Sequence, residues 1–129
     1  MSNSNTPTAW QAKGVARLWG AFKFSLAGLR AAYTEEAAFR QEVWLALVLV
    51  PLAVWLPVSL VLKALLLISM LGVLVAELLN SAVEAVVDLV SPEFHLLAKR
   101  AKDTGSAAVL VALVVLAVAW GAALLSLVG

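Results

Sequence analysis

The chain has 129 residues, of which 64% are hydrophobic and 13% are charged, and its formal net charge is +1. Soluble domains contain roughly 45–50% apolar residues, so this composition excludes an ordinary soluble domain and predicts a single membrane domain over residues 1–129. Cysteine is absent from the sequence, which excludes disulfide and thiolate chemistry, and the few basic residues lie beside apolar segments, which argues against nucleic acid as a partner.

The N-terminal part is predicted to be a disordered tail, residues 1–12, followed by an amphipathic surface helix, residues 13–33. In this helix, apolar residues recur on one face and basic residues lie opposite or beside them, as in helices that lie in the plane of lipid headgroups. A soluble helix packed on a core is the alternative, and the apolar segments that follow favour the membrane surface. The apolar face consists of Val15, Leu18, Trp19, Phe22, Leu26, Leu29 and Tyr33.

Three transmembrane helices are predicted at residues 36–62, 64–90 and 103–128, because each segment is apolar and long enough to cross a bilayer. Trp44 and Trp55 lie near the two ends of the first segment, where aromatic residues anchor spanning helices at the interface. The fold class is therefore predicted to be an all-α membrane protein.

Local signals mark the ends of the first spanning segment. Thr34 is expected to cap this helix at its N-terminus. Pro51 and Pro57 are expected to kink or end it, since proline lacks the backbone donor that a helix interior needs.

The basic residues predict the orientation of the chain. Cytoplasmic segments carry an excess of Lys and Arg, so the N-terminus and the loop between the second and third spans are expected in the cytoplasm. Lys63 is the basic residue on the other side. The cytoplasmic set consists of Lys13, Arg17, Lys23, Arg30, Arg40, Lys99, Arg100 and Lys102.

A polar stripe runs along the second span. Glu77, Asn80, Ser81, Glu84 and Asp88 fall within an arc of roughly 100° on one helix face. An acid inside a spanning helix costs at least ~2.5–3.5 kcal/mol on insertion scales and usually marks a functional path. At the C-terminus of a helix a carboxylate is unfavourable for the dipole, so Asp88 predicts a cationic group nearby.

Further charged residues are expected at the cytoplasmic level of this stripe. Carboxylates at a wet membrane edge can hold Mg²⁺, which keeps waters and is usually shared with substrate phosphates. Glu77 lies deeper and is placed to act as a general base on the hydroxyl of a lipid. The polar residues are equally compatible with interhelical contacts in an oligomer or with a transport path. The other members are Glu36, Glu42, Glu93, His95, Lys99, Arg100, Lys102 and Asp103.

Three segments resemble the prokaryotic diacylglycerol kinase family. Residues 77–88, ELLNSAVEAVVD, fill every fixed position of the signature of that family. Residues 28–32 and 36–42 resemble its N-terminal block, and residues 102–108, KDTGSAA, resemble the start of its third spanning helix. The resemblance extends from about Arg17 to the C-terminus with the same order and spacing.

The resemblance implies a small lipid kinase of the bacterial inner membrane. Members are homotrimers of three-span protomers, each with an N-terminal surface helix and with active sites shared between subunits. They transfer the γ-phosphate of MgATP to diacylglycerol and give phosphatidic acid, so the implied cofactor is Mg²⁺ and the implied partners are ATP, a membrane lipid and further copies of the chain. The active site and the N-terminus are expected on the cytoplasmic side.

The resemblance also implies roles for individual residues. Glu77 matches the general base, and Glu36 and Glu84 match the metal-holding carboxylates, with Asn80 and Asp88 as supporting residues. The nucleotide-binding positions are Arg17, Phe24, Glu36, Glu84, Glu93, His95, Lys102 and Asp103. The lipid-site positions are Arg17, Arg30, Gln41, Glu42, Trp55 and Ser106. Phe24, Leu96 and Lys99 depart from the family, which has a tyrosine, an acid and a glycine there.

Two alternatives remain beside this interpretation. An undecaprenol kinase, the related activity in part of the family, would keep the phosphoryl chemistry and change the acceptor. The full surface helix and the block around Arg30 and Glu42 resemble the diacylglycerol type more closely. A small oligomeric proton or ion translocator with Glu77 as carrier would explain the intramembrane acid, but it does not predict the cytoplasmic charged cluster.

Overall fold

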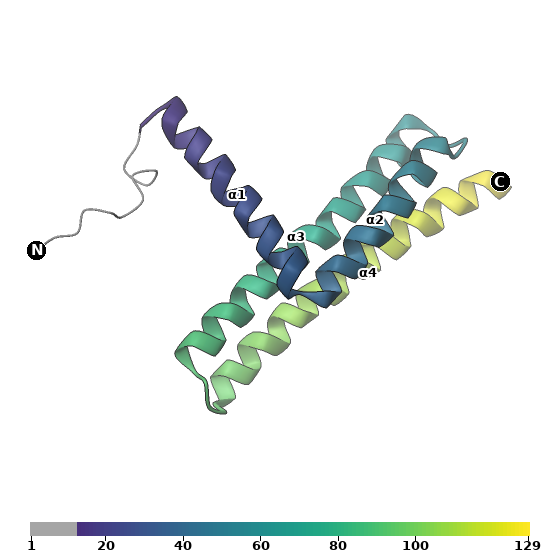
Figure 1. Ribbon diagram of the computed structural model, residues 1–129. Coiled ribbons are helices and arrows are strands. Elements are labelled where there is room, and N and C mark those ends of the chain that lie inside the picture. Colours follow the sequence, from purple (N-terminus) through teal and green to yellow (C-terminus); the bar gives the residue numbers. More distant parts are fainter. Residues whose placement is uncertain (1–12) are drawn as a thin grey trace, which may run out of the picture.

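The computed structural model describes residues 13–129, so the tail predicted at residues 1–12 lies outside the described part (Figure 1). All regular structure in the described part is helical. The helices are α1 Val15–Glu35, α2 Ala37–Trp55, α3 Leu60–Val90 and α4 Leu96–Val128. The predicted all-α class is confirmed.

Three of the helices are long and apolar enough to cross a membrane. They are α2, α3 and α4, with mean hydropathy values of 1.6, 2.3 and 2.8 over their most apolar windows. Figure 1 shows them side by side, with α2 covering only the half of the α3–α4 pair that carries the α2–α3 turn. The other half of the pair, toward the α3–α4 turn, extends beyond the start of α2. Helix α1 leaves the bundle at the level where α2 begins.

The turn between α2 and α3 lies earlier than the sequence predicts. Helix α2 continues past Pro51 and ends at Trp55, not at residue 62. Pro57 follows in the turn, and Ser59 caps α3 by accepting a hydrogen bond from the Leu62 amide at 3.2 Å. The spans predicted at residues 36–62 and 64–90 are therefore separated at residues 56–59, because a proline and a serine cap act there together.

Two other helix ends also differ from expectation. Thr34 does not cap α2, because it lies inside α1 and its hydroxyl donates to the carbonyl of Arg30 at 3.0 Å. The N-cap of α2 is Glu36, with an extended backbone. Helix α4 begins at Leu96, well before the predicted residue 103, because the Nδ1 atom of His95 accepts from the Leu97 amide at 3.0 Å and caps it.

One face of α3 forms the core of the bundle. Leu66, Met70 and Val73 are at most 1% exposed and follow a helical spacing between α2 and α4. Glu77 continues this row and is 6% exposed. The buried row of α3 therefore passes directly into the polar stripe.

The elbow between α1 and α2 is fixed by an arginine. The Nη1 atom of Arg40 donates to the carbonyl oxygens of Tyr33 and Thr34 at 2.8 and 2.9 Å. These carbonyls belong to the last turn of α1, where helix geometry leaves acceptors without partners. The side chains of Ala32 and Phe39 are buried on the two sides of the elbow. This arrangement holds α1 at a set angle to the bundle.

Candidate functional site

The candidate site begins with a pair of carboxyl groups between α2 and α3. Glu42 and Glu77 lie close enough together to interact electrostatically. The Oε2 atom of Glu42 is buried and has no hydrogen-bond partner. The pair therefore places two carboxyl groups deep in the bundle, next to the place where α1 joins α2.

Two more carboxylates surround this pair. Glu36, at the N-cap of α2, and Glu84, two turns further along α3, both interact electrostatically with Glu77. Glu36 and Glu84 are half-buried, so one side of each remains accessible. Like charges at this spacing repel one another, and a cation bound among them would relieve the repulsion.

The carboxylates of Glu36 and Glu84 fit a Mg²⁺ ion that is shared with a substrate phosphate better than they fit a metal held by protein ligands alone. No group of three or more His, Cys, Asp or Glu side chains in residues 13–129 is arranged to hold a metal ion. Mg²⁺ is usually bound by one or two carboxylates, several waters and substrate phosphates. Glu36 and Glu84 are carboxylates of this kind, so the residues present fit a metal that arrives with a phosphorylated ligand.

Asn80 joins the carboxylates to α4. Its Nδ2 atom donates to the Oε1 atom of Glu84 at 3.4 Å. Its Oδ1 atom is buried, has no hydrogen-bond partner and faces Gly105 of α4. Asn80 therefore lies between the proposed metal ligand and the neighbouring helix.

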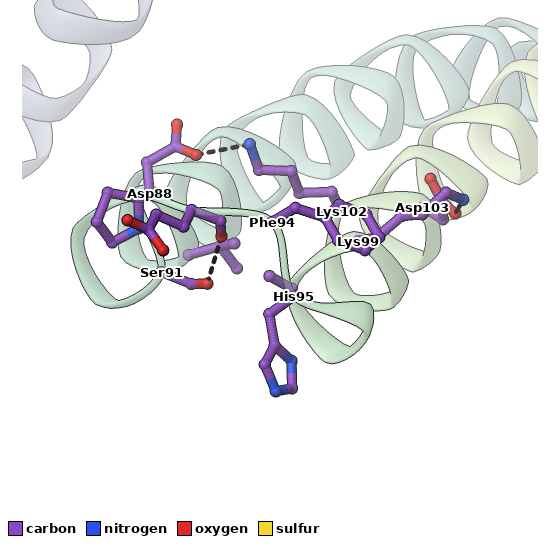
Figure 2. A pocket seen from close by; sticks show the side chains of 11 residues that line it. Asp88, Ser91, Phe94, His95, Lys99, Lys102 and Asp103 are labelled. Atoms are coloured by element: carbon purple, nitrogen blue, oxygen red, sulfur yellow. Dashed lines mark hydrogen bonds and ion pairs between the residues drawn. The ribbon is translucent and has the colours of Figure 1, made fainter.

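A second part of the site is a pocket of about 400 Å³ at the α3–α4 turn (Figure 2). The Nζ atom of Lys102 lies 2.6 Å from the Oδ1 atom of Asp88, and Lys99 pairs with Asp103 one turn apart on α4. The cation predicted beside Asp88 is thus confirmed as Lys102. The lining residues are Val87, Asp88, Ser91, Pro92, Glu93, Phe94, His95, Ala98, Lys99, Lys102 and Asp103.

The pocket contains four of the predicted nucleotide-binding residues. Glu93, His95, Lys102 and Asp103 all line it. The imidazole of His95 points away from the ion pairs in Figure 2, and its Nδ1 atom caps α4. A structural role therefore accounts for His95 in the protomer, and a nucleotide contact remains a prediction.

Two other predicted site residues, Arg17 and Trp55, lie away from this region within one protomer. Arg17 lies in the first turn of α1, at the end away from the bundle (Figure 1). Trp55 ends α2 and is 79% exposed, about 20 Å from Glu42 by helical rise. Phe24 and Arg30 are on α1, Gln41 is on the first turns of α2, and Ser106 is on α4 next to Gly105. The protomer alone therefore gathers only part of the predicted set.

Sequence reasoning missed three features of the site. It gave Glu42 no relation to Glu77, and it assigned no role to Arg40 or Gly105. The only available signal for Gly105 was its position in the segment KDTGSAA, because the approach of α4 to Asn80 depends on packing between helices.

Comparison with known proteins identifies the family. The profile described as prokaryotic diacylglycerol kinase matches residues 23–124. The chain belongs to this family. The matched region includes every predicted site residue except Arg17.

Relatives named diacylglycerol kinase are similar along most of the chain. The protein of Escherichia coli K12 is 49% identical over 107 residues, which cover 83% of this chain and 88% of the relative. The Pseudomonas aeruginosa protein is 53% identical over 112 residues, covering 87% and 91%. The Helicobacter pylori 26695 protein is 43% identical over 127 residues, covering 98% of both chains.

Proposed function

We propose that this protein is an ATP-dependent diacylglycerol kinase. It transfers the γ-phosphate of ATP to the primary hydroxyl of diacylglycerol and produces phosphatidic acid. The observation that carries the proposal is the similarity to relatives of that name at 43–53% identity over most of the chain. The three candidate membrane spans agree with a substrate that resides in the bilayer.

The carboxyl pair supports a specific division of roles. Glu77 is the general base that accepts the proton of the lipid hydroxyl as the new O–P bond forms and the bond to ADP breaks. Glu77 is buried, with 6% of its surface exposed, so it lies on the lipid side of the polar residues rather than in open water. Glu42, together with Arg30, Gln41, Trp55 and Ser106, belongs to the lipid side of the site.

The nucleotide side of the site faces the cytoplasm. Glu36 and Glu84 would hold Mg²⁺, and the metal would neutralise charge on the phosphate oxygens of ATP. Lys102 adds a cation next to these oxygens, and Asp88 and Asn80 support Lys102 and Glu84 through the contacts described above. The remaining nucleotide-binding residues are Arg17, Phe24, Glu93, His95 and Asp103.

The complete site forms in a homotrimer in the bacterial inner membrane, with the N-terminus and α1 on the cytoplasmic side. Two observations support an oligomer. Arg17 is far from the pocket of its own protomer, and the apolar face of α1 is exposed, from Val15 at 82% to Tyr33 at 38%. A helix with such a face lies on the membrane surface, where it can reach a neighbouring protomer.

An acceptor assay tests the function. Purified protein in mixed micelles is given ATP, Mg²⁺ and either diacylglycerol or undecaprenol, and the phosphorylated lipid is quantified. Phosphatidic acid formation is expected, and preferential phosphorylation of undecaprenol would reassign the acceptor. Proton flux through reconstituted vesicles without any lipid phosphorylation would instead identify a translocator.

A further inference from the structure

The side chain of Asn80 occupies space that only a glycine on α4 leaves open. A Cβ atom added to Gly105 would collide with the Oδ1 atom of Asn80 and lie 3.4 Å from its Cγ atom. Gly28, Gly72 and Gly121, three other glycines inside helices, have nothing within 4 Å of the same position. Among these four glycines, only Gly105 meets a side chain of another helix at that position.

The orientation of the Asn80 amide follows from its two neighbours. Its Nδ2 atom is directed to the Glu84 carboxylate, because a carboxylate accepts hydrogen bonds and would repel the amide oxygen. The Oδ1 atom then faces α4, where it is buried without a hydrogen-bond partner. Such an unsatisfied acceptor is unfavourable, so the conformation persists only because the glycine leaves room for it.

The contact between Asn80 and Glu84 is sensitive to small movements. Its donor–acceptor distance is 3.4 Å, at the long end for a hydrogen bond. Because the contact is already long, a small rotation of the amide away from α4 would break it. The group displaced by a Cβ atom is the end of a side chain, which can turn aside without a change in the fold.

We propose that Gly105 is a positioning residue for the reaction: it gives Asn80 the space to hold the Glu84 carboxylate in the orientation that binds the metal–nucleotide complex. The inference rests on the proposed metal role of Glu84. Gly105 itself contributes no side-chain chemistry.

A double-mutant cycle tests the proposal. Gly105→Ala, Asn80→Ala and the double variant are compared for binding of Mn²⁺ with a non-hydrolysable ATP analogue, measured by electron paramagnetic resonance. Each single variant should bind about tenfold more weakly, the scale of one lost hydrogen bond to a charged group. The double variant should bind no more weakly than Asn80→Ala, because both changes remove the same contact.

Gly121→Ala is the matched control, since Gly121 is also half-buried in α4 and has free space around it. Both alanines favour the helix over glycine, so an effect on helix stability alone would appear equally in the two variants. Wild-type binding by Gly105→Ala, an equal loss in Gly121→Ala, or losses that multiply in the double variant would overturn the proposal.

The cycle also remains decisive if a variant folds poorly. Should Gly105→Ala fail to fold, the double variant must recover folding, because it removes the group that collides; misfolding of both would overturn the proposal. Glu84→Gln reports separately on the proposed metal role. If Glu84→Gln binds Mn²⁺ normally, the proposed metal role of Glu84 is wrong. The coupling of Gly105 to Asn80 is then judged from the unfolding temperatures of wild type, the two single variants and the double variant.

Discussion

The carboxylate of Asp88, near the end of α3, and the ammonium group of Lys102, in the second turn of α4, form an ion pair with Oδ1 and Nζ 2.6 Å apart. The pair joins the two helices across the pocket at their turn (Figure 2). It offsets the unfavourable position of a carboxylate at a helix C-terminus. It also fixes the position of the cation that we propose meets the phosphates of ATP.

Removal of this ion pair is expected to affect nucleotide use more than stability. In Asp88→Asn, the side chain of Lys102 loses its fixed position, and the KM for ATP should rise about two- to fivefold, the scale of an exposed pair. The two side chains are 42% and 66% exposed, so the free energy of unfolding should fall by less than about 1 kcal/mol. Steady-state kinetics at low and high salt measure the effect, and Asp88→Glu is the control. An unchanged KM at low salt would contradict the positioning role.

Loss of the base is expected to stop the chemistry while the fold and nucleotide binding persist. Glu77→Gln is nearly isosteric, and phosphorylation should fall by roughly 10²–10⁴-fold, the usual contribution of general acid–base catalysis. Glu77→Asp should recover little, because it withdraws the carboxylate from the acceptor hydroxyl by one methylene group. Ser69→Ala, at another buried polar position on α3, is the control and should remain active. Near-full activity of a folded Glu77→Gln protein would leave Glu77 as an interhelical contact.

Metal dependence is expected to involve Glu36 and Glu84. Glu84→Gln should require a higher Mg²⁺ concentration for half-maximal activity, because one of few carboxylate ligands is lost. Binding of diacylglycerol should remain, since that substrate meets the other side of the site. Titration of activity with Mg²⁺ measures this, with Glu35→Gln, an exposed acid at the end of α1, as the control. The same Mg²⁺ requirement in wild type and Glu84→Gln would refute the assignment.

Shared sites predict recovery of activity in mixed oligomers. Inactive Glu77→Gln chains and inactive Arg17→Ala chains, unfolded and reassembled together, should regain part of the activity, because some sites then combine an intact residue from each chain. Arg17 lies far from the pocket of its own protomer, which motivates this choice. Cross-linking verifies that mixed oligomers form. If verified mixtures stay inactive, each site is built within one protomer.

Arg40, at the elbow between α1 and α2, is expected to hold α1 at the angle that activity requires. Arg40→Ala removes two hydrogen bonds to the end of α1 and should lower the free energy of unfolding by about 1–3 kcal/mol. Distances between spin labels on α1 and α2 should broaden, and activity should fall. Lys63→Ala is the matched control, because Lys63 donates to the Val54 carbonyl at 2.6 Å at the other end of α2. It should lose stability without losing activity. Equal effects in the two variants would show that α1 needs no fixed angle.

The sequence predicts those features of the structure that depend on a single helix face. The polar stripe of α3 and the cation beside Asp88 follow from helical periodicity and the helix dipole, and both are found. The ends of the helices were less predictable. Helix α2 ends at Trp55 because Pro57 and the Ser59 cap act together. The hydropathy of the sequence continues through this turn without a break, so it does not mark the end. The contacts of Glu42 with Glu77 and of Asn80 with Gly105 depend on how neighbouring helices are rotated and shifted, which periodicity within each helix does not encode.

The unequal lengths of the spanning helices have a consequence for how the enzyme selects its acceptor. Helix α2, with 19 residues, measures about 28 Å, close to the hydrocarbon thickness of a bilayer, whereas α3 and α4, with 31 and 33 residues, measure about 46 and 50 Å. With the proposed orientation, the pair of long helices continues into the cytoplasm past α1, and Glu77 stays at a fixed depth below the headgroups. If Glu77 is the base, as we propose, an acceptor lipid has to bring its hydroxyl to that depth below the interface before phosphoryl transfer.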